Sequence, residues 1–186
     1  ILVTINNVPT ASISPATATI CNGQSVTLTA SGGGTYAWSN SSSGAVISVS
    51  PGATTTYTVT VTAAGGCSAT ASRIVTVNFP PEATVTPFTQ TICSGQSATL
   101  TASGGGTYLW STGATTAAIT VNPSSTTTYV VTVTGVNTCS ATASGLVNVN
   151  TSPTAQVTPS TQTICNGQSA TLTASGGTSY SWNTSA

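Results

Sequence analysis

The stretch "ATICNGQSVTLTASGGGTYAW" (residues 18–38) combines the features that decide the fold of this chain. Val26, Leu28 and Ala30 alternate with threonines, the period-two pattern of a strand with one face in a core and one in water. A run of glycines then marks a turn, after which Tyr36 and Trp38 resume the alternation. The stretch therefore predicts two β-strands joined by a tight turn.

The stretch recurs twice, as "QTICSGQSATLTASGGGTYLW" (residues 90–110) and "QTICNGQSATLTASGGTSYSW" (residues 162–182). Its cysteines stand at 21, 93 and 165, so the step is 72 residues. A fixed period of this size indicates an array of similar domains. We expect residues 1–8 to be the last strand of a preceding repeat, 9–80 and 81–152 to be complete repeats, and 153–186 to be the N-terminal part of a truncated third repeat.

The remainder of each repeat also reads as strands. "TTTYTVTVT" (54–62) alternates strictly, and "CSATASRIVTVN" (67–78) reads as a long last strand in which Arg73 falls on the apolar parity. Arg73 therefore predicts a bulge that turns its side chain outward, where Glu82 could pair with it weakly. Six or seven short strands separated by Gly- and Ser-rich turns predict an all-β fold of tandem immunoglobulin-like β-sandwich repeats.

Composition argues against several classes of function. The 186 residues include one Lys or Arg, one Asp or Glu and no His. Acid–base catalysis, nucleophile activation and metal or cofactor binding all need groups that this chain almost entirely lacks, so we predict no enzyme, no metal site and no cofactor. A basic patch for nucleic acid is excluded, and the sequence has no apolar run long enough to span a membrane.

The cysteines are equally spaced within each complete repeat. Cys21 and Cys67 are 46 residues apart, and so are Cys93 and Cys139. This equality favours one disulfide inside each repeat, and hence an oxidising, extracellular or periplasmic compartment. A reactive thiol is the alternative, but no His or basic neighbour would activate it. By the same spacing, we expect Cys165 to pair with a residue beyond the end of the sequence, at position 211.

Trp38, Trp110 and Trp182 have two interpretations. They could be platforms for stacking sugars, but a Tyr-x-Trp strand within a sandwich more often supplies core aromatics. We therefore expect all three indoles to be core residues.

The motifs I-C-x-G-Q-S, Y-x-W, T-T-T-Y-x-V-T-V-T and C-S-A-T-A together resemble the Ig-like, PKD-like tandem repeats of large secreted surface adhesins of gliding bacteria, often exported by the type IX system. The resemblance covers both full repeats and the partial third. It implies disulfides Cys21 to Cys67 and Cys93 to Cys139, and core positions for Trp38, Tyr57, Trp110 and Tyr129.

Two functional hypotheses follow. The first is a structural array at the cell surface, forming the stalk or fibre of an adhesin or filament; short, Pro-containing junctions and a nearly uncharged surface favour stiffness and self-association. The alternative is a carbohydrate-binding module of an adhesin or of a secreted polysaccharide-degrading enzyme, with a glycan or other cell-surface ligand as partner.

Overall fold

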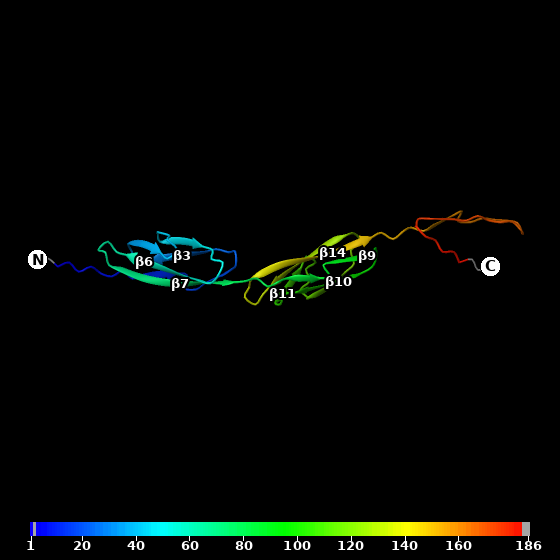
Figure 1. Ribbon diagram of the computed structural model, residues 1–186. Coiled ribbons are helices and arrows are strands. Elements are labelled where there is room, and N and C mark those ends of the chain that lie inside the picture. The colour runs from blue at the N-terminus through cyan, green and yellow to red at the C-terminus, as the bar shows by residue number, and fades with distance from the viewer. Residues whose placement is uncertain (2, 184–186) are drawn as a thin grey trace.

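The computed structural model describes residues 1 and 3–183, and within them the secondary structure is entirely β. Two sandwiches follow one another end to end along one long axis, and a two-stranded hairpin follows the second (Figure 1). The predicted all-β, immunoglobulin-like architecture is confirmed.

The first sandwich consists of two sheets. One sheet has the order β1-β3-β5 and the other the order β2-β7-β6-β4. Neighbouring strands are antiparallel except β2 and β7, which run parallel. The strands are β1 (Ser12–Ser14), β2 (Ala18–Cys21), β3 (Val26–Ser31), β4 (Thr35–Trp38), β5 (Val46–Val49), β6 (Thr55–Thr62) and β7 (Ser68–Asn78).

The second sandwich repeats this topology, with sheet orders β12-β10-β8 and β11-β13-β14-β9. Its parallel pair is β9 with β14. The strands are β8 (Thr84–Thr86), β9 (Thr89–Cys93), β10 (Ala98–Ser103), β11 (Thr107–Trp110), β12 (Ala118–Val121), β13 (Thr127–Thr134) and β14 (Ser140–Asn150).

Each sandwich has its own hydrophobic core between its sheets. Trp38, Tyr57, Trp110 and Tyr129 are all buried, at the positions where core aromatics were expected. The indole N–H of Trp38 donates to the carbonyl oxygen of Gly44 at 2.9 Å, and that of Trp110 to the carbonyl of Thr116 at 2.9 Å. These bonds satisfy the one polar atom of each ring while its carbon surface is removed from water.

The third copy forms only the first hairpin of a repeat. β15 (Gln156–Thr158) pairs with β16 (Thr173–Ser175) in the same register as β1 with β3. Its large apolar side chains are about half exposed, Trp182 at 46% among them, so this copy has no core of the kind the two sandwiches have. Residues 3–8, predicted as the last strand of a preceding repeat, lie outside the strands, and that assignment remains a prediction.

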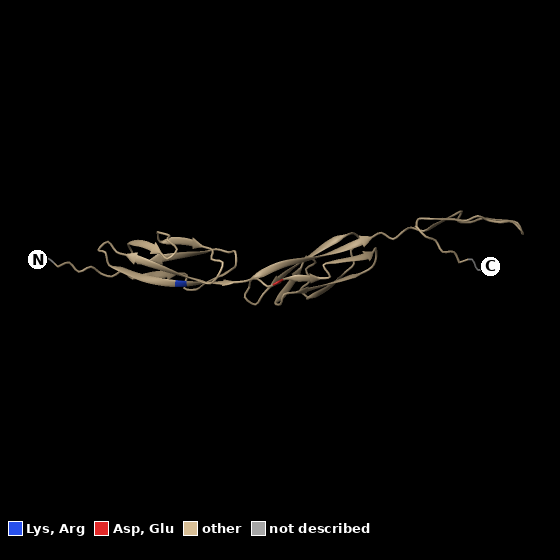
Figure 2. Ribbon diagram, in the orientation of Figure 1, with Lys and Arg blue, Asp and Glu red and all other residues tan. Residues whose placement is uncertain are grey.

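The predicted bulge at Arg73 is wrong. β6 and β7 pair without interruption, with Tyr57 opposite Arg73. The guanidinium instead bonds to the backbone of β1 and of the segment that follows it: Nη2 donates to the carbonyl of Ile13 at 3.0 Å, and Nη1 donates to that of Ala16. Glu82 lies in the segment just before β8, so the cation is in the first sandwich and the acid at the entry to the second (Figure 2).

The glycine turn between β10 and β11 tests how closely this turn packs against the end of β13. Gly106 has φ +93°, and a Cβ there would lie 2.0 Å from the carbonyl oxygen of Thr134; Gly105 has φ +76° and faces open space. Gly105→Ala should cost about 1 kcal/mol of unfolding free energy, from backbone strain alone. Gly106→Ala should cost about 3 kcal/mol, because the strand backbone must also move. Urea unfolding of both variants measures the difference, and equal losses would contradict the turn geometry.

Candidate functional site at the junction between the repeats

The disulfide of this protein joins the two repeats. Cys21 is bonded to Cys139, with 5.7 Å between their Cα atoms, while Cys67, Cys93 and Cys165 are free. The predicted pairings Cys21 to Cys67 and Cys93 to Cys139 are therefore wrong. The observed sequence separation is 118 residues, which is the expected 46 plus one repeat of 72.

Strand direction explains why a bridge within one repeat cannot form. The parallel pairing of β2 with β7 places Cys21 opposite Asn78, at the far end of β7, whereas Cys67 immediately precedes its near end. Eleven residues of extended chain separate the two ends by roughly 35 Å. A disulfide needs Cα atoms within about 7 Å, so the two thiols of one repeat lie at opposite ends of its sandwich. The register of β9 with β14 imposes the same separation on Cys93 and Cys139.

The carbonyl of Asn78 lies at the centre of the junction. It accepts a hydrogen bond from the backbone N–H of Asn22 at 2.8 Å, and the sulfur of Cys139 lies 3.8 Å from it. Asn78 ends β7 and leads directly into the linker, residues 79–83, that enters the second sandwich. The bridge therefore closes beside the linker.

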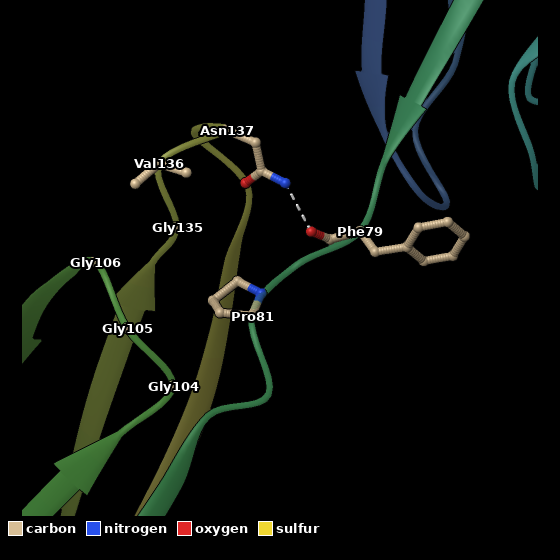
Figure 3. Close-up of a pocket in the computed structure, with 8 residues that line it drawn as sticks. All are labelled: Phe79, Pro81, Gly104, Gly105, Gly106, Gly135, Val136 and Asn137. Carbon is tan, nitrogen blue, oxygen red and sulfur yellow. Dashed lines mark hydrogen bonds between the residues drawn. The ribbon is translucent and has the colours of Figure 1, made fainter.

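Asn137 provides a further contact across the junction. Its Nδ2 donates to the carbonyl oxygen of Phe79 in the linker at 2.9 Å (Figure 3). Its Oδ1 accepts a hydrogen bond from the backbone N–H of Cys139 at 3.2 Å. The side chain thus fixes the cysteine and the linker together. Figure 3 also shows the ring of Phe79 pointing away from this contact.

A related contact lies at the N-terminal end of the first sandwich. Asn6, the counterpart of Asn78, donates from Nδ2 to the carbonyl oxygen of Gly65 at 3.0 Å. Gly65 is the counterpart of Asn137 one repeat earlier, and a Cβ on it would lie 2.4 Å from the Asn6 side chain. At both ends, an asparagine side chain therefore joins the loop before the last strand to the segment that enters the sandwich.

A shallow pocket of about 280 Å³ lies at the junction between the linker and two turns of the second sandwich (Figure 3). No titratable side chain lines it; its walls are Phe79, Pro81, Gly104, Gly105, Gly106, Gly135, Val136 and Asn137. Among the described residues there is no group of three or more His, Cys, Asp or Glu that could hold a metal ion. Within residues 1 and 3–183 no helix is long and apolar enough to cross a membrane.

The contacts at the junction restrain the two sandwiches relative to each other. Two covalent connections, the linker and the disulfide, join the sandwiches at neighbouring points, and the Asn137 hydrogen bond adds a third. A single flexible linker would allow rotation about each of its backbone bonds, whereas a second connection removes most of these motions. In the chain-entropy model, closing a 118-residue loop also stabilises the folded state by about 5 kcal/mol.

Among known proteins, only solved structures are similar to this chain. No protein-family model matches the sequence, and no curated protein matches it. Solved structures that match include the N-terminal four Ig domains of Dscam1 isoform 9.44, at 16% identity and a TM-score of 0.34, covering 76% of this chain and 46% of that one. The same domains of Dscam1 isoform 4.4 match at 17% identity and a TM-score of 0.34, covering 79% and 44%. This chain thus spans less than half the length of these structures.

The bridge predicts a fixed orientation of the two sandwiches. In the oxidised protein, residual dipolar couplings from both should fit one alignment tensor. The double variant Cys21→Ser/Cys139→Ser should need two tensors of different magnitude, because only the linker and one hydrogen bond would still join the domains. Cys67→Ser is the matched control and should behave as the parent. A single shared tensor in the double variant would show that the disulfide does not set the orientation.

Proposed function

We propose that this chain is a load-bearing spacer, part of an array of immunoglobulin-like sandwiches that forms the stalk or fibre of an extracellular adhesin or filament. The observation that carries this proposal is the double covalent connection at the junction. A disulfide between neighbours adds nothing to a binding loop, but it stiffens an array and transmits force from one domain to the next. The motif resemblance to repeats of secreted adhesins of gliding bacteria supports the surface location, including export by the type IX system.

The surface of the sandwiches supports the same role. Cross-strand hydroxyl pairs lie on the sandwiches, among them Ser12 with Ser31 at 2.7 Å and Thr58 with Ser72 at 2.8 Å. Because these hydroxyls satisfy each other and the chain has almost no charge, little electrostatic repulsion opposes the packing of one array against another. This surface supports the proposed self-association of neutral arrays into a fibre. The disulfide also favours an oxidising compartment outside the cytoplasm.

The carbohydrate-binding alternative has less support. Trp38 and Trp110 are 4% and 2% exposed and bond to carbonyls of their own domains, so neither presents a face on which a sugar could stack. The spacer is therefore the function that the geometry favours.

Electron microscopy of defined arrays tests the proposal. Arrays of four and eight copies of residues 81–152, produced under oxidising conditions, should double in end-to-end length when the number of repeats doubles. A flexible string would lengthen only about 1.4-fold, since its span grows with the square root of its length. Arrays in which every cysteine is replaced by Ser are the matched control and should approach the flexible limit. Flexible oxidised arrays would contradict a spacer role.

A further inference from the structure

Two free cysteines occupy positions equivalent to the bonded pair. Cys93 is the counterpart of Cys21, and Cys67 is the counterpart of Cys139, each displaced by 72 residues. Cys93 lies at the C-terminal end of the second sandwich, and Cys67 at the N-terminal end of the first. Neither has a partner within the described residues, and they lie at opposite ends of the two-domain unit.

The surroundings of Cys93 reproduce those of Cys21. Cys93 pairs with Asn150 in parallel register, as Cys21 does with Asn78. The backbone N–H of Ser94 donates to the Asn150 carbonyl at 2.9 Å, which matches the 2.8 Å bond that the Asn78 carbonyl accepts beside the bridge. The thiol of Cys93 is exposed. The strand end that receives a bridge in the first repeat is therefore already formed in the second.

The surroundings of Cys67 likewise reproduce those of Cys139. The carbonyl oxygen of Cys67 accepts a hydrogen bond from the backbone N–H of Ala63 at 2.9 Å. The carbonyl oxygen of Cys139 accepts the equivalent bond from Gly135 at 2.8 Å. Its sulfur lies 3.5 Å from the carbonyl oxygen of Asn6, one repeat before Asn78, whose carbonyl lies 3.8 Å from the sulfur of Cys139. The segment before the first sandwich thus approaches Cys67 in the same way as the linker approaches Cys139.

We propose that Cys93 and Cys67 are bridge sites for further repeats of the same kind. Cys93 bonds the cysteine that follows Cys139 by 72 residues, at position 211, and Cys67 bonds the counterpart of Cys21 in a preceding repeat. Each interior repeat then carries one bridge to each neighbour and none within itself. By the same rule, the partner of Cys165 lies 118 residues on, at position 283, and not at position 211 as the spacing of 46 predicted. This inference rests on the proposed spacer function and names the disulfides that would join its neighbouring repeats.

Formation of each bridge is an oxidation of two thiols. The thiols lose two protons and two electrons as the sulfur–sulfur bond forms. A small-molecule disulfide such as oxidised glutathione accepts the electrons, and its own sulfur–sulfur bond breaks to give two thiols. The partner thiol belongs to a neighbouring repeat of the same chain, which the linker holds close by.

A chain of three complete repeats tests the inference directly. Residues 1–152 are followed by a second copy of 81–152, whose cysteines take positions 165 and 211, and the protein is oxidised with a glutathione redox buffer. Peptic digestion at acid pH, which prevents disulfide exchange, should give one peptide pair joining Cys21 to Cys139 and a second joining Cys93 to position 211. Cys67 and the cysteine at position 165 should react with iodoacetamide in the folded protein. Bridges joining Cys93 to Cys139 and position 165 to position 211, or a free thiol at Cys93, would overturn the inference.

Replacement of the cysteine at position 211 by serine is the matched control. In this variant Cys93 should become reactive toward iodoacetamide, while the bridge between Cys21 and Cys139 remains. A reactive cysteine at position 165 instead of Cys93 would indicate bridges within repeats. Failure of this inference can be distinguished from failure of the proposed spacer function. Bridges within repeats in arrays that still lengthen in proportion to repeat number would refute this inference alone. Bridges between repeats in flexible arrays would refute the spacer function alone.

Discussion

The parallel pairing of β2 with β7 determines where the first cysteine of each repeat lies. Because β2 runs alongside the last four residues of β7, Cys21 lies at the end of the sandwich from which the chain leaves for the next domain. Cys139, which precedes the last strand of the second repeat, lies at the end by which the chain enters. A strand pairing inside one domain thus brings together two thiols of different domains. The position of the disulfide follows from this pairing, and the Asn137 contact lies beside it.

Much of the sandwich could be predicted from the sequence, because its features are local. The alternation through Val26, Leu28 and Ala30 corresponds to β3, the Tyr-x-Trp segment to β4, and residues 67–78 to β7 with a difference of one residue. Trp38 and Trp110 were expected in the core and are buried there. Period-two patterns report which face of a strand is covered, and this requires no knowledge of the rest of the fold.

The cysteine partners could not be predicted, for a reason specific to repeats. A spacing of 46 and a spacing of 118 differ by one period of 72, so both pairings obey the same sequence symmetry. Only the direction of β2 relative to β7 separates them, and alternation patterns do not encode direction. The bulge predicted at Arg73 was wrong because its hydrogen-bond partners are distant in sequence. Alternation correctly placed Arg73 on the apolar parity of β7, but it could not show that the carbonyls of Ile13 and Ala16 accept hydrogen bonds from the guanidinium.

Because the bridge lies between the sandwiches, each sandwich core depends on packing, and both cores contain fully buried Leu and Val side chains. The bridge is instead expected to limit motion between the domains. Non-reducing peptic mapping of the chain itself tests this most directly, by mass spectrometry of the peptide that contains Cys21. The account predicts that this peptide is joined to the one that contains Cys139. A peptide joining Cys21 to Cys67 would contradict it.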